Sequence, residues 1–544
     1  MKKPSSYLNF FPLILGVAGA VALCSYISPW AAVKPDSTIY LRMAEEIQKG
    51  YWHIDQWIRG VYSGPPLYPM LVALVEWVIP GFETAGTIVS IFAASASVTP
   101  LFFLARHFYN EKVAYLAVPL TILNPWYLEY MILPLTEALF TFLFVAGLYL
   151  ILCAVTKNSS KLWLTVGVAS GAAWMSRDAG IILPFLSFLW FAISIWKNEY
   201  LFSKIVRNGV ALVLGIVLVY VPLKVVMTMD HKGIPDPPPD NSIAFQMMMP
   251  DLRDSMKREI YLGGLTADGT GYAFIEAQKN PPKLVDLLKH WDHIVRRLGH
   301  NFYEIVKSVW EVLGLVLLAV LVGILRGKDL DRQGPEGFPG GLLFLGSCVL
   351  SYLLFYALAG GFTGAVGPER YLVPLIPIWG IWAASGIFLL GKYMERFNVK
   401  HLGKLIILLF IGIIFISSLP GIRQIRQSNY EEIKWVELYK LLGTRLRGYG
   451  MNNMVIMARA PFLSYYAGAS WVMMPYGEYP EIIKFARARH VDFLYMERGM
   501  APLRPQLSFL LRSNGAVPEM ERVYHMRHRG NPQYLAVVLY RIKY

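Results

Sequence analysis

Long runs of apolar residues recur along the first 420 residues of the chain, separated by short polar stretches. Each run can cross a hydrocarbon core of about 30 Å, and inside a membrane only helices satisfy all the backbone polar groups of such runs. The pattern therefore predicts a polytopic α-helical membrane protein. The eleven predicted spans are 10–28, 86–105, 113–126, 134–155, 162–175, 179–196, 208–226, 303–325, 341–359, 371–390 and 405–420.

The pattern changes beyond residue 420, where short strand-like runs alternate with amphipathic ones. Such an alternation indicates a small α/β domain. We therefore expect a transmembrane module at 1–420 and an α/β domain at 421–544. In the second part, helices are predicted near 429–447, 478–490 and 504–512, and strands at Met454–Met457, Trp471–Met474, Val491–Tyr495, Arg522–Met526 and Tyr534–Tyr540.

Basic residues occur in every second short connection, and the positive-inside rule assigns these connections to the cytoplasm. The N-terminus is then cytoplasmic, while the first loop (30–85), a second long loop (227–302) and the C-terminal domain lie outside. The first span begins with basic residues, as a signal peptide does, but no small-residue cleavage site is evident. We expect this span to be retained.

Composition narrows the function classes. The chain is 55% hydrophobic and 16% charged, with a net charge of +14. Much of the positive excess lies in the inside connections, so it is interpreted as a topology signal and no nucleic-acid partner is expected. Cys24, Cys153 and Cys348 all fall within spans, which indicates no disulfide framework. No P-loop, dinucleotide fingerprint or Ser-His-Asp spacing supports a nucleotide-driven reaction or a hydrolase triad.

Asp36 is the first candidate for chemistry. It precedes an amphipathic run, Thr38–Gln48. An aromatic-rich stretch then ends in Pro65-Pro66-Leu67-Tyr68-Pro69, which we expect to open the second span. An unpaired carboxylate at the membrane interface costs desolvation energy, so it is a functional candidate by default. The alternative is that Asp36 caps the helix that follows it, and the two roles are compatible.

Three further charged residues lie at the predicted outer ends of spans. Glu137 follows Pro134 at a helix start, where the helix dipole alone would favour an anion; its functional interpretation is a second carboxylate facing the same outer cavity as Asp36. Arg177 and Arg370 suit bidentate contact with a lipid phosphate. Alternatively, they pair with their sequence neighbours Asp178 and Glu369, or extend to headgroups.

Other polar clusters are weaker candidates. Arg59 in the first outer loop is a third possible phosphate contact. The run His290-Trp291-Asp292-His293 has helical ligand spacing, but a basic amphipathic helix on the membrane surface is the favoured interpretation, and no metal site is predicted. Arg459 and Tyr465-Tyr466 could touch a substrate, although packing within the α/β domain is the better interpretation.

Taken in order, these residues resemble the GT-C superfamily of integral-membrane glycosyltransferases, and in particular the protein O-mannosyltransferase and ArnT-like (aminoarabinose lipid A transferase) group. The resemblance covers most of the chain, although each motif alone is short. The motifs are Asp36-x-x-x-Tyr40-x-x-x-Ala44, Pro65-Pro66-Leu67-Tyr68-Pro69, Thr136-Glu137, Arg177, Glu369-Arg370-Tyr371-Leu372 and Tyr465-Tyr466-Ala467-Gly468.

The resemblance implies an inverting glycosyltransferase that uses a polyprenyl-phosphate sugar at the outer face of the bacterial inner membrane, with a lipid, glycan or protein acceptor and no cofactor. Asp36 and Glu137 would be the catalytic carboxylates, and Arg370, Arg177 and Arg59 would contact the donor phosphate. We expect Tyr40, Tyr68, Glu369 and Tyr371 to line the substrate cavity.

One position departs from the ArnT-like pattern: those enzymes have a lysine just before the Pro-Pro-Leu, where this chain has Gly64. The aminoarabinose donor is therefore not implied. Two other classes of protein stay open, namely a secondary transporter or lipid flippase and a non-catalytic envelope scaffold. The absence of an internal repeat weighs against transporter folds that are built from repeats.

Overall fold

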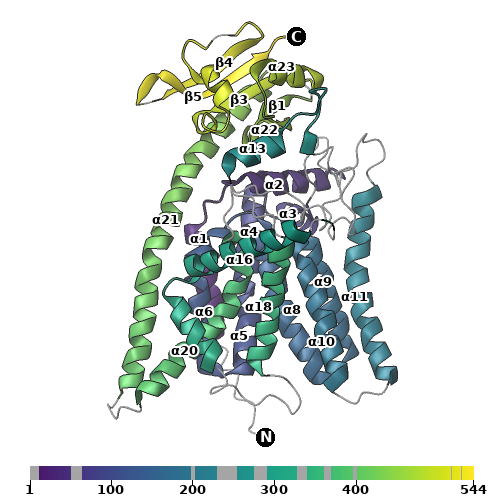
Figure 1. The fold of residues 1–544 in the computed structure, drawn as a ribbon, viewed down its shortest axis with the longest axis vertical. Helices are drawn as coiled ribbons and strands as arrows, with labels where there is room; N and C mark the ends of the chain where they lie inside the picture. Colours follow the sequence, from purple (N-terminus) through teal and green to yellow (C-terminus); the bar gives the residue numbers. More distant parts are fainter. Residues whose placement is uncertain are drawn as a thin grey trace.

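The computed structural model describes residues 11–50, 64–197, 202–229, 254–274, 289, 291–326, 340–359, 369–395, 401–451, 453–515, 517–528 and 530–544. A bundle of helices forms one end of the molecule and a small sheet domain forms the other (Figure 1). The predicted fold class, a helical membrane protein with a C-terminal α/β domain, is confirmed.

Each of the eleven predicted spans overlaps one or two α-helices among the described residues. Among the described residues, seven helical stretches are long and apolar enough to cross a membrane, or eight if one bent pair counts as a span. The helices α1, α6 and α9 are shorter, with 17, 12 and 17 residues. The helices of this module are α1 (Phe11–Ile27), α2 (Pro35–Gln48), α3 (Leu67–Glu76), α4 (Phe82–Ala96), α5 (Val98–Phe108), α6 (Glu111–Ile122), α7 (Pro125–Met131), α8 (Thr136–Lys157), α9 (Ser160–Ser176), α10 (Ile182–Lys197), α11 (Phe202–Met229), α13 (Ser255–Gly263), α16 (Trp291–Leu313), α17 (Val316–Arg326), α18 (Gly341–Ala359), α19 (Glu369–Leu372), α20 (Ile376–Met394) and α21 (Leu402–Arg447).

Two expectations about the spans need correction. The prediction of one continuous span at 303–325 is wrong, because α16 and α17 meet at an angle of 110°. Gly314, in the left-handed conformation between them (φ +49°), permits this turn. The Pro65–Pro69 motif opens α3, a separate helix of ten residues, and the second long span begins only at Phe82.

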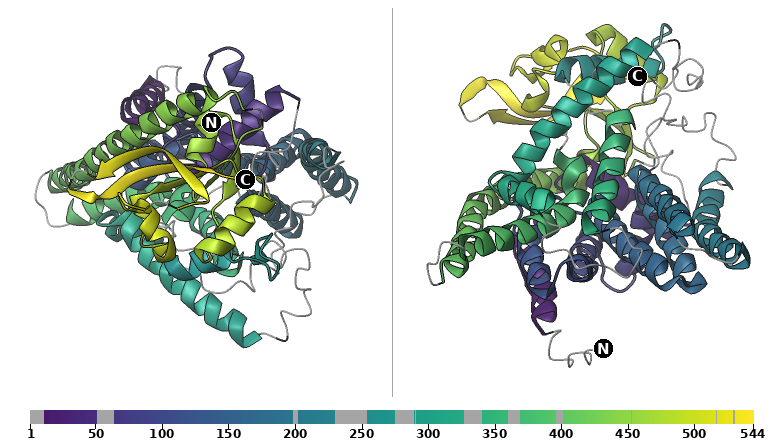
Figure 2. Two further views of the ribbon diagram at one scale, coloured as in Figure 1. Left: turned by 90° about the horizontal axis from the view of Figure 1, so that it is seen from above. Right: turned by 60° about the horizontal axis from the view of Figure 1, so that its bottom comes forward.

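Helix α16 lies at the rim of the bundle and is seen along its length from above (Figure 2, left). One stripe of the helix packs inward, while the stripe beside it exposes apolar side chains, among them Trp291, Phe302 and Trp310. The charged side chains Asp292, Arg296 and Lys307 are also exposed. This amphipathic pattern agrees with the surface helix that the sequence predicts for the region.

Helix α21 joins the two ends of the molecule (Figure 1). Its first part exposes apolar side chains such as Leu405, Leu408 and Ile416, as expected of a helix that faces lipid. The helix then continues without interruption through Pro420 to Arg447, 46 residues in all. The boundary predicted at 420/421 thus lies inside one helix, which connects the bundle rigidly to the sheet domain.

The C-terminal domain is a five-stranded sheet in the order β2-β1-β3-β5-β4. Strand β1 runs parallel to β2 and β3, whereas β5 is antiparallel to β3 and β4. All four residues of β1 are buried, as is typical of a strand covered on both faces. The elements of the C-terminal domain are β1 (Val455–Ala458), α22 (Phe462–Ala467), β2 (Ser470–Met473), α23 (Tyr479–Ala488), β3 (Phe493–Glu497), a 3-10 helix (Pro505–Leu511), β4 (Met520–His528) and β5 (Asn531–Ile542).

Residues 254–274, which belong to the second long loop, pack onto this domain. The carboxylate of Glu259 in α13 accepts hydrogen bonds from Arg459 and makes a 2.7 Å ion pair with Arg504, which is almost fully buried. Tyr272 inserts into the hydrophobic core of the domain and donates to the carbonyl of Met473. Arg459 thus has a packing role, as expected. This described segment of the loop and the α/β domain form one structural unit.

Candidate active site between the helical bundle and the sheet domain

Four charged side chains that are far apart in the sequence meet where the bundle faces the sheet domain. Arg370 Nη1 lies 2.7 Å from Asp36 Oδ2, and Arg370 Nε donates to Glu137 Oε1. Arg177 Nη1 lies 2.8 Å from the same Glu137 oxygen. The four groups form a chain, Asp36–Arg370–Glu137–Arg177, in which two negative and two positive charges balance.

Local structure places each member. Asp36 is in the first turn of α2, where Lys34 is the N-cap residue and Pro35 the first helical residue. Glu137 is in the first turn of α8, and Arg177 is the extended residue that ends α9. Arg370 belongs to the short helix α19, which a 3-10 turn at Val373–Leu375 separates from α20. Four helix ends therefore converge on one point.

The side chains differ in their exposure. That of Glu137 is fully buried, those of Arg370 and Arg177 are 11% and 15% exposed, and that of Asp36 is 44% exposed. A buried carboxylate is tolerated only with compensating charge, which the two arginines supply. Of the four side chains, that of Asp36 is the most exposed, and the two arginines keep a small exposed fraction. The structure does not support the alternative that Asp36 caps α2, because Lys34 is the N-cap residue and this N-terminus has no side-chain cap hydrogen bond.

The ion pairs that the structure shows for Arg370 and Arg177 are with residues of other helices, and not with their sequence neighbours Glu369 and Asp178. Glu369 is buried and accepts a 2.9 Å hydrogen bond from Ser308 of α16, while Arg370 pairs with Asp36 and Glu137. Arg177 forms its ion pair with Glu137 from another helix. Both arginines thus connect different elements of the bundle.

Aromatic rings surround the charged chain. The Arg370 guanidinium lies 5.8 Å from the ring centre of Tyr130, and the Arg177 guanidinium lies 5.6 Å from that of Tyr371. Tyr40, one turn after Asp36, packs edge-on against Tyr68 at 5.9 Å. Burial, followed by the negative charges of Asp36 and Glu137, raises the pKa of Tyr40, so it stays a neutral phenol.

Tyr68 lies in the packed interface between α3 and α4. It is fully buried, and its hydroxyl donates to the Gly86 carbonyl and contacts the hydroxyl of Ser90. It therefore packs α3 against α4 behind Tyr40. Of the other expected residues, Arg59 and His290 lie outside the described residues. In the described part of the chain, no group of three His, Cys, Asp or Glu side chains is arranged to hold a metal ion.

Sequence reasoning missed helix α7, which carries Tyr130 to the site. Asn124 caps this helix by accepting from the Tyr127 amide, and Pro125 is its first residue. Asn-Pro is a recognisable helix-start signal. The adjacent residue, Glu129, lies 3.9 Å from Lys34, just before α2. Because Tyr130 faces Arg370 and Glu129 faces Lys34, two residues before Asp36, α7 forms part of the wall of the site.

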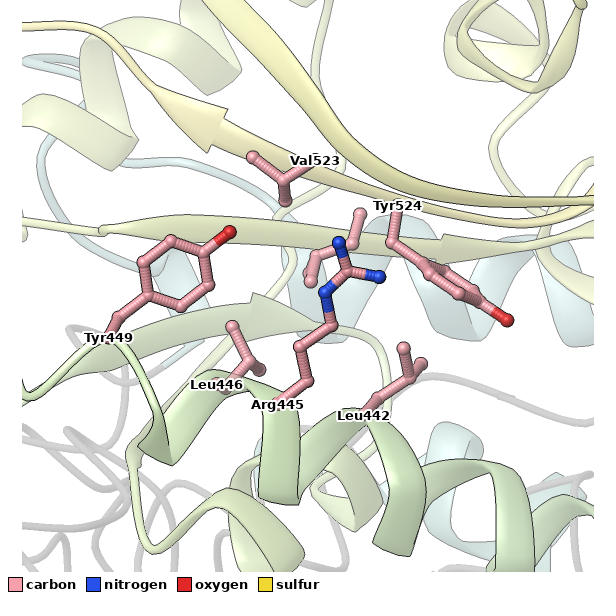
Figure 3. Close-up of a pocket in the computed structure, with 7 residues that line it drawn as sticks. Leu442, Arg445, Leu446, Tyr449, Val523 and Tyr524 are labelled. Carbon is pink, nitrogen blue, oxygen red and sulfur yellow. The ribbon is translucent and has the colours of Figure 1, made fainter.

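A shallow pocket in the C-terminal domain is separate from this site. It lies between the end of α21 and strands β4 and β5 (Figure 3). Apolar side chains such as Leu442 and Val523 line it, and Arg445 lies 5.9 Å from the ring centre of Tyr524. None of the four charged residues of the chain lines it.

Comparisons with known proteins agree with this fold. Residues 63–223 match the family model described as dolichyl-phosphate-mannose-protein mannosyltransferase. This segment contains Glu137 and Arg177 but not Asp36 or Arg370. No curated protein matches the chain in sequence.

Three solved structures illustrate the structural likeness. The oligosaccharyltransferase AglB from Archaeoglobus fulgidus, in complex with an inhibitory peptide and a dolichol-phosphate, aligns with a TM-score of 0.59 at 12% identity, covering 97% of this chain and 74% of its own. ArnT from Cupriavidus metallidurans, bound to undecaprenyl phosphate, aligns with a TM-score of 0.53 at 12% identity, covering 97% and 98%. The arabinofuranosyltransferase AftD from Mycobacteria gives 0.52 at 12% identity, covering 98% and 40%.

All three are GT-C glycosyltransferases. The chain therefore has the GT-C fold, and its resemblance to the ArnT-like and protein mannosyltransferase group is confirmed. At this level of identity the solved structures establish the fold, and the reaction has to be argued from the site.

Proposed function

We propose that this protein is an inverting glycosyltransferase that moves a sugar from a polyprenyl-phosphate-linked donor to a lipid, glycan or protein acceptor of the cell envelope. The reaction takes place at the outer face of a bacterial inner membrane, the side on which the α/β domain lies. The observation that supports this most is the contact between Asp36 and Arg370, an accessible carboxylate 2.7 Å from a largely buried guanidinium. The matching family and the undecaprenyl phosphate bound to ArnT support the class of donor.

Arg370 is suited to hold the donor phosphate. A guanidinium has five N–H donors, and the contacts among the described residues direct Nε at Glu137 and one N–H of Nη1 at Asp36. The remaining donors, on Nη2 above all, can bind phosphate oxygens. A polyprenyl phosphate is an anionic leaving group, so its departure needs neutralisation of charge more than it needs a proton.

Asp36 acts as the general base. The acceptor hydroxyl or amine loses its proton to Asp36 as its oxygen or nitrogen attacks the anomeric carbon. The new glycosidic bond forms while the bond from the anomeric carbon to the phosphate oxygen breaks, with that electron pair leaving on the polyprenyl phosphate. Attack from the face opposite the phosphate inverts the anomeric configuration.

Glu137 organises the two arginines. Its Oε1 forms ion pairs with both Arg370 and Arg177. Because its side chain is fully buried, Glu137 does not contact a substrate directly in this conformation. In this proposal Glu137 sets the direction of the Arg370 guanidinium, and Arg177 adds positive charge beside the phosphate. Tyr40, Tyr371 and Glu369 complete the surroundings, and Arg59 is kept as a further candidate phosphate contact.

Transfer of radiolabel from a polyprenyl-phosphate sugar to envelope acceptors by the detergent-purified protein tests the proposal. Wild type should transfer sugar and Asp36→Asn should not. Glu46→Gln is the matched control, because it removes a carboxylate of the same helix that pairs with Arg42 and lies outside the site. Proton NMR of the first product formed would show inversion or retention.

A secondary transporter or lipid flippase is the alternative. If folded wild type consumes no donor from a panel of polyprenyl-phosphate sugars but moves a labelled lipid across liposomes, the glycosyltransferase proposal fails.

A further inference from the structure

Glu83 connects three parts of the molecule that are distant in sequence. Its Oε1 accepts a 2.8 Å hydrogen bond from the backbone amide of Ala32 and a 2.6 Å hydrogen bond from the Tyr466 hydroxyl. Its Oε2 lies 2.6 Å from the ammonium group of Lys440. Ala32 precedes α2, Tyr466 belongs to α22, and Lys440 belongs to α21.

The Ala32 contact bears directly on Asp36, which follows four residues later. Ala32 is fully buried in the connector between α1 and α2, and the other end of this connector is fixed by a 3.0 Å hydrogen bond from Ser28 Oγ to the Ile132 carbonyl. The connector contains Trp30 in the left-handed conformation (φ +52°), which a bulky residue rarely adopts. A backbone held in such a conformation needs external contacts to keep its path.

The contacts from the C-terminal domain are equally well defined. The side chain of Glu83 is 17% exposed, and the Lys440 ammonium also lies 5.4 Å from the ring centre of Tyr466. Burial raises the pKa of Tyr466, as does the adjacent Glu83 carboxylate, so its hydroxyl stays a hydrogen-bond donor. Burial, followed by the negative charge of Glu45 in α2, raises the pKa of the neighbouring residue, Tyr465.

A purely local role for Glu83 does not account for these contacts. As the second residue of α4, it would interact favourably with the helix dipole wherever its side chain pointed. Instead, both of its oxygens are used by donors from three other elements, and two of those donors come from the α21–α22 part of the C-terminal unit.

We propose that Glu83 is a positioning residue through which the C-terminal α/β domain holds Asp36 in place against Arg370. This inference rests on the proposed function of Asp36 as the general base. The Glu83 carboxylate binds both the α1–α2 connector and the α/β domain. The orientation of Asp36 therefore depends on the position of α22. Displacement of α22 would release the connector and lower turnover with no change at the donor phosphate contacts.

Hydrogen exchange tests the connection independently of activity. The Ala32 amide is itself the donor to Glu83, so exchange in the segment 31–34 reports on the contact directly. Glu83→Ala should accelerate exchange there by about tenfold or more, as expected for the loss of a hydrogen bond to a charged group. Tyr466→Phe, which keeps the ring, should give a smaller increase in the same direction.

Kinetics distinguish positioning from general destabilisation. Glu83→Ala should lower kcat by about tenfold or more with an unchanged KM for the donor, since the misplaced group is the base. Glu83→Gln keeps one acceptor oxygen and should recover part of the loss. Tyr479→Phe is the matched control, because it removes a hydroxyl that donates to Glu519 at 2.9 Å inside the same domain, away from α2.

The outcomes separate the two proposals. Wild-type exchange in segment 31–34 together with wild-type kcat in Glu83→Ala would overturn the positioning role, and so would equal effects of Tyr466→Phe and Tyr479→Phe. If wild type transfers no sugar at all, the proposed function fails, while accelerated exchange would still show that Glu83 holds the connector.

Discussion

Arg370 and Asp36 are 334 residues apart in the sequence and 2.7 Å apart in the structure. The contact joins the first turn of α2 to the short helix before α20, so that an early and a late segment of the chain close one site. Because Arg370 also donates to Glu137, the position of the accessible carboxylate is tied to the buried charges of the bundle.

Asp36→Asn should lower kcat by about 10²- to 10⁴-fold, the usual contribution of a general base. The amide oxygen can still accept from Arg370, so donor affinity should stay within a few-fold of wild type. Single-turnover transfer and equilibrium binding of a labelled polyprenyl-phosphate sugar measure the two effects separately. Substantial turnover in Asp36→Asn, measured alongside Glu46→Gln, would remove Asp36 from the role of base.

Arg370→Met should weaken donor binding, because it removes the cation that faces the phosphate. It also leaves Glu137 with Arg177 as its remaining ion-pair partner among the described residues, and loss of one partner of a buried pair costs about 3–5 kcal/mol. The double variant Arg370→Met/Glu137→Gln should be no more stable than Arg370→Met, because it also removes the ion-pair partner of Arg177, and it should not recover donor affinity. Thermal unfolding and donor binding of the two variants would show whether both effects share one cause.

The members of the site could be predicted from sequence, but their pairing could not. Each is a charged residue at the end of an apolar run, and such residues are costly without a function. The nearest available partner of Arg370 in the sequence is Glu369, yet adjacent side chains on a helix do not face each other. The structure pairs Glu369 with Ser308 and Arg370 with Asp36, which only the tertiary fold determines.

For the fold too, the sequence predicted the local elements but not how they are arranged in space. The apolar runs of the sequence predicted the positions of the helices. The 110° turn between α16 and α17, however, depends on Gly314 within an otherwise helical pattern. The continuity of α21 through Pro420 was equally hidden, because proline usually ends or kinks a helix. The five strands of the α/β domain were expected close to their observed places, but its docking on Glu259 involves residues roughly 200 positions apart.

The ion pairs of Glu259 predict a pH dependence of stability. Burial alone would raise the pKa of this carboxyl, but Arg504 and Arg459 lower it below its usual range. A carboxyl with a lowered folded-state pKa contributes stability above its unfolded pKa of about 4.3, and that contribution is lost as the pH falls below it. The difference in thermal unfolding temperature between wild type and Glu259→Gln should therefore be constant from pH 6 to 8, to within about a degree, and shrink toward pH 3.

A difference that grows on acidification would contradict this assignment. Tyr479→Phe again serves as a control within the same domain, and its effect on the unfolding temperature should not follow the titration of Glu259.

Gly86→Ala should reduce activity through close packing. A Cβ at Gly86 would lie 2.8 Å from Leu41 of α2 and 2.8 Å from Pro134 ahead of α8, closer than carbon atoms can approach. Over-packing of this kind costs about 1–3 kcal/mol, and here it would push α2, with Asp36, away from the end of α8 that carries Glu137. Gly346→Ala in α18 is the matched control, since its Cβ would meet nothing within 4 Å. We expect Gly86→Ala to lower kcat with donor binding retained and Gly346→Ala to behave as wild type. Equal kcat in both variants would show that the spacing between α2 and α4 does not control the reactive geometry.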